Sequence, residues 1–134
     1  MNKICKLLHL LRTVDVWQTW RLYRTQPHDR SAQLHVCNKS QIHIDKTAKI
    51  EMQPKAIFEF NMMEDPFKEV HPSRLILHPN SKLVCKGHIQ SFEAVKIECL
   101  PNAVLKIGDK SYINHDSEIR CREHISWEQH IHRL

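Results

Sequence analysis

The stretch LHPNSKLVCKGHIQSFEAVKIECLPNAVLKIGDKSYINHDSEIRCREHISWEQHI, residues Leu77 to Ile131, decides the fold. Every sixth residue in it belongs to one series: Leu77, Leu83, Ile89, Val95, Pro101, Ile107, Ile113, Ile119, Ile125 and Ile131. Nine of these ten are Leu, Ile or Val, and the exception is Pro101. A helix repeats its apolar residues every three or four positions, and a two-faced strand repeats them every two. A fixed period of six instead indicates a repeat architecture.

The period predicts a parallel β-solenoid in which each hexapeptide forms one side of a triangular coil and its periodic residue points into the core. With three hexapeptides to a coil, Ile113 is expected one coil beyond Val95, and Ile131 one coil beyond Ile113. Small residues four places after the periodic one suit the same unit: Ser81, Gly87, Ser111 and Ser117. The alternative is a sheet protein whose strands happen to be spaced by sixes.

Corners between the sides are expected where turn-forming residues interrupt the rhythm. Pro101 lacks an N–H for the ladder and should mark a corner or a local irregularity. Asn102 and Asp109 suit corners with left-handed backbone angles. The chain has two glycines, Gly87 and Gly108, which is few for a solenoid.

The segment NAVLKIGDKSYINHDSEIRCREHISW, Asn102 to Trp127, resembles the hexapeptide-repeat acyltransferases that fold as a left-handed parallel β-helix. It is most similar to O-acetyltransferases of capsular and cell-surface polysaccharides. The matching motifs are Ile107-Gly108-Asp109 and Tyr112-Ile113-Asn114. The resemblance spans residues 75–131 well and the preceding part loosely. It specifies the fold more strongly than the substrate.

The resemblance implies acetyl transfer from acetyl-coenzyme A to a sugar hydroxyl. A histidine acts as general base, without a metal or a covalent intermediate. It also implies a homotrimer with sites between subunits. Asn114 and His115 are then candidates for lining the acceptor site, and His115 is a weak candidate for the base. Asp116 and Glu118 are candidates to orient a histidine, and Cys121 is a weaker candidate nucleophile.

The end of the chain departs from the family pattern. Ser126 and Trp127 stand where the family usually has Gly and an acidic residue. The family's catalytic histidine normally follows in later coils, after an Asp-rich segment that this sequence lacks. We therefore expect the catalytic residue beyond the chain end, an incomplete β-helix, and little or no activity for these 134 residues alone.

Composition narrows the context further. The formal net charge is +5, which suits an anionic partner without selecting one. No nucleic-acid-binding motif is recognisable. The five cysteines have no metal-type spacing, so a reducing cytoplasm without a disulfide framework is expected. The 11 histidines show no ligand motif, and no metal site is predicted. No apolar run reaches the ~20 residues that span a bilayer.

Two units are expected along the chain. Residues 1–26 contain an amphipathic helix, with apolar residues at helical spacing over residues 3–24 and Pro27 ending it. This helix either covers the open edge of the first coil, with Trp17 and Leu22 on its packing face, or lies on a membrane at its inner, cytoplasmic surface. Residues 27–134 form the β-helix domain, starting with an irregular coil around Ile44 and Ile50. Residues 58–74 are expected to be a loop inserted at a corner.

Three hypotheses for function follow. The first is an O-acetyltransferase chain that is incomplete. The second is a non-catalytic solenoid that scaffolds a partner, in which Asn114 and His115 have no role. The third is a basic binding module for nucleic acid or a membrane, which would bind in a steeply salt-dependent manner.

Overall fold

The computed structural model describes residues 15–26, 30–62 and 71–127, and it is mainly β with one helix. The helix is α2 (Val16–Thr25). The strands are β1 (Gln33–Val36), β2 (Ser40–Ile44), β3 (Lys49–Met52), β4 (Ile57–Met62), β5 (Ser73–Leu77), β6 (Lys82–Cys85), β7 (His88–Phe92), β8 (Lys96–Cys99), β9 (Val104–Ile107), β10 (Ser111–Ile113), β11 (Glu118–Cys121) and β12 (His124–Trp127).

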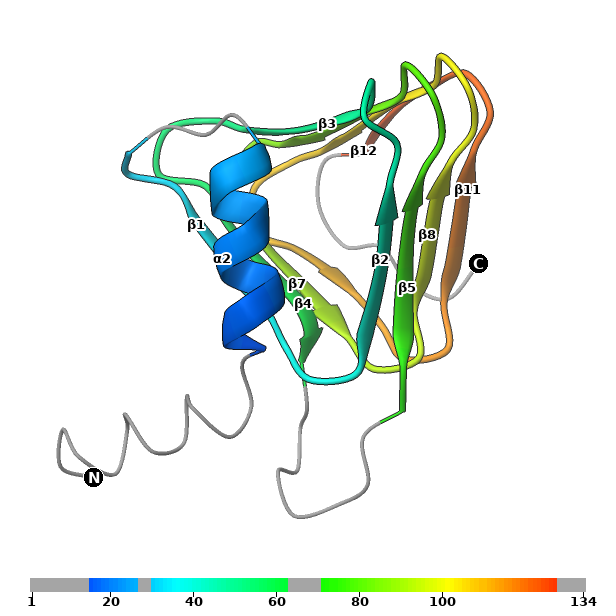
Figure 1. Cartoon of the computed structure of the whole chain (residues 1–134). Coiled ribbons are helices and arrows are strands. Elements are labelled where there is room, and N and C mark those ends of the chain that lie inside the picture. The colour runs from blue at the N-terminus through cyan, green and yellow to red at the C-terminus, as the bar shows by residue number, and fades with distance from the viewer. Residues whose placement is uncertain (1–14, 27–29, 63–70, 128–134) are drawn as a thin grey trace, which may run out of the picture.

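The strands form three four-stranded parallel sheets, in the orders β1-β4-β7-β10, β2-β5-β8-β11 and β3-β6-β9-β12. Consecutive strands belong to different sheets, and every third strand returns to the same one. The sheets are the sides of a triangle that encloses the core (Figure 1). The prediction of a parallel β-solenoid is confirmed.

The length of a coil differs from the prediction. Ile97 pairs with Ile119, 22 residues later, and Leu83 pairs with Leu105 at the same separation. Ile113 lies beside Ser91, so the expected stacking of Ile113 on Val95 is wrong. The coil is longer than three hexapeptides because two of its three sides are eight residues long. The first inward-facing residues of four consecutive sides are Ser73, Ser81, Ile89 and Val95. They are separated by eight, eight and six residues.

The six-residue series nevertheless identified the core. Each strand points alternate residues inward, and all sides of the later coils advance by an even number of residues. The inward-facing residues of these coils therefore all have odd numbers. A six-residue series that starts at an odd position falls on inward-facing residues, except where a position lies in a corner. Its members from Leu77 to Ile119 are buried, with one exception. That exception is Pro101, which is exposed in a turn, as predicted.

Left-handed backbone angles recur at the corners, in residues other than glycine. Positive φ values of 56–66° occur at Lys39, Lys55, Asn61, Asn80, Ala94, Asn102, Lys110 and Asp116. Six of these precede an inward-facing Ser or Ala. Asn102 adopts the angle as predicted. At the next corner Lys110, not Asp109, adopts it.

The small residues that suit the repeat unit are buried. Ser81 and Ser111 are buried, and each donates its hydroxyl to the carbonyl oxygen three residues earlier, at 2.7 and 2.8 Å. Gly87 and Ser117 are buried as well. A larger side chain here would collide with the adjoining coil, because protein interiors are close-packed.

Helix α2 covers one edge of the first coil with hydrogen bonds that replace a missing strand. The backbone amides of Leu34 and Val36 in β1 donate to the side-chain oxygens of Tyr23 (2.6 Å) and Thr19 (3.1 Å). The amide of Ile50 in β3 donates to Gln26 Oε1 at 2.8 Å. Unpaired buried amides are costly. The predicted covering of a solenoid edge by this helix is thus confirmed for α2.

Two sequence boundaries need correction. Trp17 is exposed on α2, so it does not share the packing face of Leu22, which is buried. The packing face consists instead of Leu22 and of polar side chains that bond to the strand edge. The loop expected at 58–74 begins too early, because β4 continues to Met62 with Phe58 and Phe60 buried, and β5 already begins at Ser73. Residues 3–14, Ile131 and the centre of that loop lie outside the described residues.

Candidate functional site

The residues predicted to line a site, Asn114 and His115, lie together at the corner that follows β10. Asn114 is exposed, and its Oδ1 accepts a hydrogen bond from the His115 amide at 3.2 Å. The half-buried His115 ring lies against Phe92 of the preceding coil, with 5.5 Å between ring centroids. Asp116 follows with φ 56°. The aromatic contact fixes the imidazole at the outer rim of the corner.

The same sheet carries a polar row across its outer face. His35, Glu59, Gln90 and Tyr112 occupy matching register positions on β1, β4, β7 and β10. All four are half-buried. Parallel, in-register strands bring these residues within ~5 Å of their neighbours although they are far apart in sequence. The row ends two residues before Asn114.

A histidine–carboxylate pair lies next to this row. His88 Nε2 lies 2.5 Å from Glu59 Oε1, and the His88 amide donates to Asp109 Oδ1 at 2.8 Å. The hydrogen bond from the His88 amide is the largest cause holding the pKa of Asp109 below its usual value. A carboxylate that orients an imidazole is suited to general-base catalysis. Here the Glu59 carboxylate binds Nε2 of His88, so Nδ1, which lies closer to the backbone, is the ring nitrogen left to accept a proton from a substrate.

A second pair lies on the outer face of the β2-β5-β8-β11 sheet. His78 Nε2 lies 2.8 Å from Glu98 Oε2, and Arg120 and Lys96 approach the same carboxylate at 3.4 and 3.8 Å. The pKa of Glu98 is lowered, first by the hydrogen bond with His78 and then by the two cations. Such a network ties neighbouring coils together, with a modest contribution to stability for each exposed ion pair.

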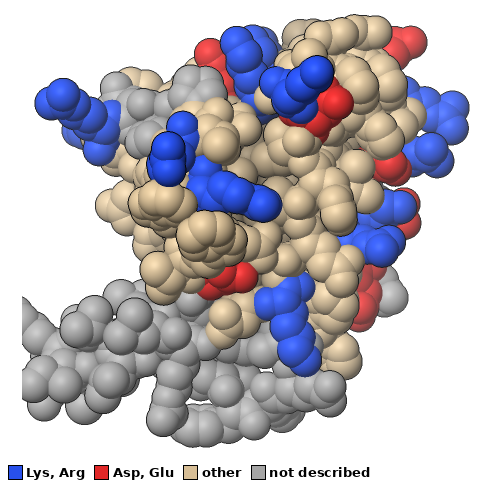
Figure 2. Space-filling model, in the orientation of Figure 1, with Lys and Arg blue, Asp and Glu red and all other residues tan. Residues whose placement is uncertain are grey.

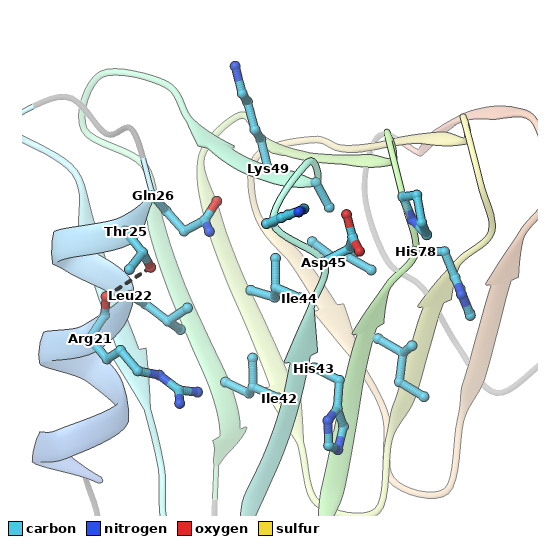
Figure 3. A pocket seen from close by; sticks show the side chains of 15 residues that line it. Arg21, Leu22, Thr25, Gln26, Ile42, His43, Ile44, Asp45, Lys49 and His78 are labelled. Atoms are coloured by element: carbon cyan, nitrogen blue, oxygen red, sulfur yellow. Dashed lines mark hydrogen bonds between the residues drawn. The ribbon is translucent and has the colours of Figure 1, made fainter.

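A groove of about 770 Å³ lies between α2 and β2. Figure 3 shows Arg21 and Leu22 pointing from the helix toward Ile42 and Ile44 of the strand. α2 touches β2 at the first residue of that strand, where Gln18 Nε2 donates to the Ser40 carbonyl at 2.8 Å, and the groove opens along the rest of the strand. β2 and β10 are the end strands at opposite ends of their sheets. The groove and the Asn114 corner are therefore separate features.

The remaining chemistry is limited. Among the described residues, no group of three or more His, Cys, Asp and Glu side chains is arranged to hold a metal. Cys121 is fully buried, and burial raises its thiol pKa, which disfavours the thiolate that a nucleophile requires. Cys37, Cys85 and Cys99 are likewise buried free thiols, and burial raises the pKa of Cys99 to about 12. No helix in the described ranges is long and apolar enough to cross a membrane.

Fold and outer faces together define a parallel β-solenoid with a helix covering part of its first coil. Comparison with protein-family models, with curated proteins and with solved structures finds no match. The Glu59–His88 pair, whose members lie 29 residues apart, was missed by sequence reasoning because it depends on the coil length. Asn114 and His115 remain predicted site residues.

Proposed function

We propose that this solenoid is a left-handed β-helix of the hexapeptide-repeat acyltransferase type that takes part in O-acetylation of a sugar or polysaccharide. The observation that carries the proposal is the repeated corner, in which a left-handed residue is followed by an inward Ser or Ala between parallel strands. The segment that resembles the family, residues 102–127, is built in this way, including Asn102 and Lys110.

The course of the chain supports the left-handed sense. Viewed with α2 nearest, as in Figure 1, the chain runs down β1, up β2 and back across β3, while later coils recede. A path that turns anticlockwise while moving away from the viewer is left-handed. The four cysteines within the described ranges are buried free thiols, which supports a reducing compartment, as proposed for a cytoplasmic protein.

In this proposal acetyl-coenzyme A is the donor and Asn114 and His115 line the acceptor site at a boundary between subunits of a homotrimer. The base must take the acceptor hydroxyl proton as its oxygen attacks the thioester. Within the described residues, His78 and His88 both direct Nε2 to a carboxylate, and His115 is tied to Phe92. We therefore propose that the 134-residue chain binds the donor but transfers acetyl groups little by itself.

The test combines binding and turnover. The purified chain should bind acetyl-coenzyme A in calorimetry, form a trimer by light scattering, and release no labelled acetyl product above the uncatalysed rate. Asn114→Ala and His115→Ala should weaken the effect that a sugar acceptor has on the binding of acetyl-coenzyme A. His43→Ala, an exposed histidine on β2, is the matched control. Absence of coenzyme binding at millimolar concentration would overturn the proposal.

A scaffold function is the second candidate, and one observation favours it. Both His–Glu pairs bridge strands of neighbouring coils, Glu59 of β4 with His88 of β7 and His78 with Glu98 of β8, as structural cross-links would. A scaffold would bind no coenzyme, and replacing Asn114 or His115 would change neither binding nor assembly. The same calorimetry therefore separates the two candidates.

A further inference from the structure

Helix α2 has two faces with different chemistry. One faces the solenoid, where Thr19, Leu22 and Tyr23 contact the first coil. The opposite face carries Val16, Trp17 and Trp20, which are 57%, 65% and 47% exposed. These three are the exposed large hydrophobic residues of the described chain. Because the edge-binding side chains determine which face is inward, they also hold the tryptophans outward.

Cations accompany the exposed rings. The Trp17 and Trp20 ring centroids are 5.3 Å apart, and the Arg24 guanidinium lies 4.9 Å above the Trp20 ring. Arg21 follows Trp20 directly, and α2 contains no acidic residue. Asp15, which directly precedes α2, caps the helix by accepting from the Gln18 amide at 3.0 Å. Figure 2 shows Lys and Arg side chains beside the uncharged surface over α2.

We propose that this face, Val16, Trp17, Trp20 and Arg24, with the exposed Arg21 at its edge beside the groove, docks on the surface of an anionic lipid bilayer. Tryptophan prefers the boundary between headgroups and acyl chains, where its apolar ring is buried and its N–H stays hydrated. Arginine binds lipid phosphates, and the net charge of +5 attracts the chain to an anionic surface. The helix would lie in the plane of the interface with the solenoid on its cytoplasmic side.

The geometry favours a bilayer over other occupants. A second copy of the same face would bring Arg21 and Arg24 against their own counterparts. Single-stranded nucleic acid requires open rings in a basic groove, whereas Trp17 and Trp20 contact each other on a convex helix and Arg24 covers one of them. The inference is independent of the proposed acyltransferase function, because it uses no residue of that site.

The experiment uses the full chain with Trp127→Phe, so that Trp17 and Trp20 are the remaining tryptophans. Vesicles of phosphatidylcholine are compared with vesicles containing phosphatidylglycerol, by sedimentation and by tryptophan emission. We expect binding to the anionic vesicles, a blue shift, and protection from iodide quenching. Trp17→Ser with Trp20→Ser should lower the partition coefficient at least about tenfold, because the buried rings supply the apolar part of binding.

Charge variants separate docking from general attraction. Arg21→Glu with Arg24→Glu should abolish binding. Lys86→Glu with Lys106→Glu, the same charge change just after β6 and on β9, should retain most of it. Equal loss in both pairs, or unchanged binding after loss of the tryptophans, would overturn the proposal. So would tryptophan-dependent dimerisation, or tighter binding to single-stranded DNA than to the vesicles. Circular dichroism checks that each variant is folded.

Discussion

The Tyr23 hydroxyl of α2 accepts a hydrogen bond from the backbone amide of Leu34 in β1, at 2.6 Å. A helix side chain therefore takes the place of a carbonyl from a neighbouring strand. Thr19 and Gln26 bind Val36 and Ile50 in the same manner. A solenoid has open sheet edges at its ends, which are prone to aggregation unless they are covered. Here the edge is covered through specific polar contacts as well as apolar burial.

This covering predicts that Tyr23→Phe destabilises the chain by about 1–3 kcal/mol, because the Leu34 amide loses its acceptor while Phe excludes water. Chemical denaturation measures the change. The control is Thr25→Val in the same helix, which removes an exposed hydroxyl that bonds to the Arg21 carbonyl. The control should change stability by less than ~0.5 kcal/mol. Equal effects for both variants would mean that the Tyr23–Leu34 bond does not hold the edge.

Left-handed corners predict stabilising substitutions. Lys39 and Lys55 have φ values of 62° and 63°, an angle that costs roughly 1–2 kcal/mol for residues other than Gly, Asn and Asp. Lys39→Asn and Lys55→Asn should each raise the free energy of unfolding by up to about 1 kcal/mol. Lys46→Asn is the control, since Lys46 is an exposed corner residue without a positive φ. If Lys46→Asn stabilised the chain while Lys39→Asn and Lys55→Asn did not, the positive φ at Lys39 and Lys55 would be wrong.

Close approach, not backbone conformation, explains Gly87. Its φ is not positive, but a Cβ built on it would lie 2.2 Å from Asp109 Oδ1. Gly87→Ala should displace that carboxylate and break its bond to the His88 amide, with a loss of about 1–3 kcal/mol. In the background Asp109→Gly, which also removes the Asp109 Cβ that would lie 2.4 Å from the new atom, the same change should cost much less. A double-mutant cycle measures this coupling, and additive effects would argue against the contact.

Acid should weaken the coils through Glu98. Its pKa is lowered in the folded chain, chiefly by the hydrogen bond with His78 and also by Lys96 and Arg120. A group whose pKa is lower in the folded chain stabilises the fold at pH values above its unfolded-state pKa. This stabilisation is lost as the pH falls through its folded-state pKa. Melting temperatures should therefore drop below about pH 4.5, and Glu98→Gln should flatten this limb. Glu118→Gln, which removes a more exposed carboxylate 3.9 Å from Lys96, is the matched control.

The core assignment predicts a severe effect at one inward position. Ile113 is fully buried, so Ile113→Asp places a charge in the core without a partner and should unfold the last described coil. The exposed neighbour Asn114→Asp introduces the same charge and should be tolerated. Circular dichroism melting compares the two. An unchanged melting profile for Ile113→Asp would show that this side chain is not inward.

The sequence predicts which residues face the core, but not which residues of neighbouring coils lie side by side. Inward positions were predictable because alternation along the strands and even-numbered sides keep a six-residue series in the core. The 22-residue coil was not, since the same series also fits a coil of 18. Pairs that depend on the coil length, such as Glu59 with His88, were therefore missed. The outward position of Trp17 was missed because polar side chains, which carry no apolar periodicity, occupy much of the packing face of α2.

The 22-residue coil can be tested at one hydrogen bond between neighbouring coils. The Lys96 amide donates to the Ser117 carbonyl of the next coil at 3.0 Å. A scalar coupling across the hydrogen bond, measured by NMR on labelled protein, should connect the Lys96 nitrogen with the Ser117 carbonyl carbon. A coupling to the Ile113 carbonyl carbon instead would mean that the coil has 18 residues, as three hexapeptides require, and not 22.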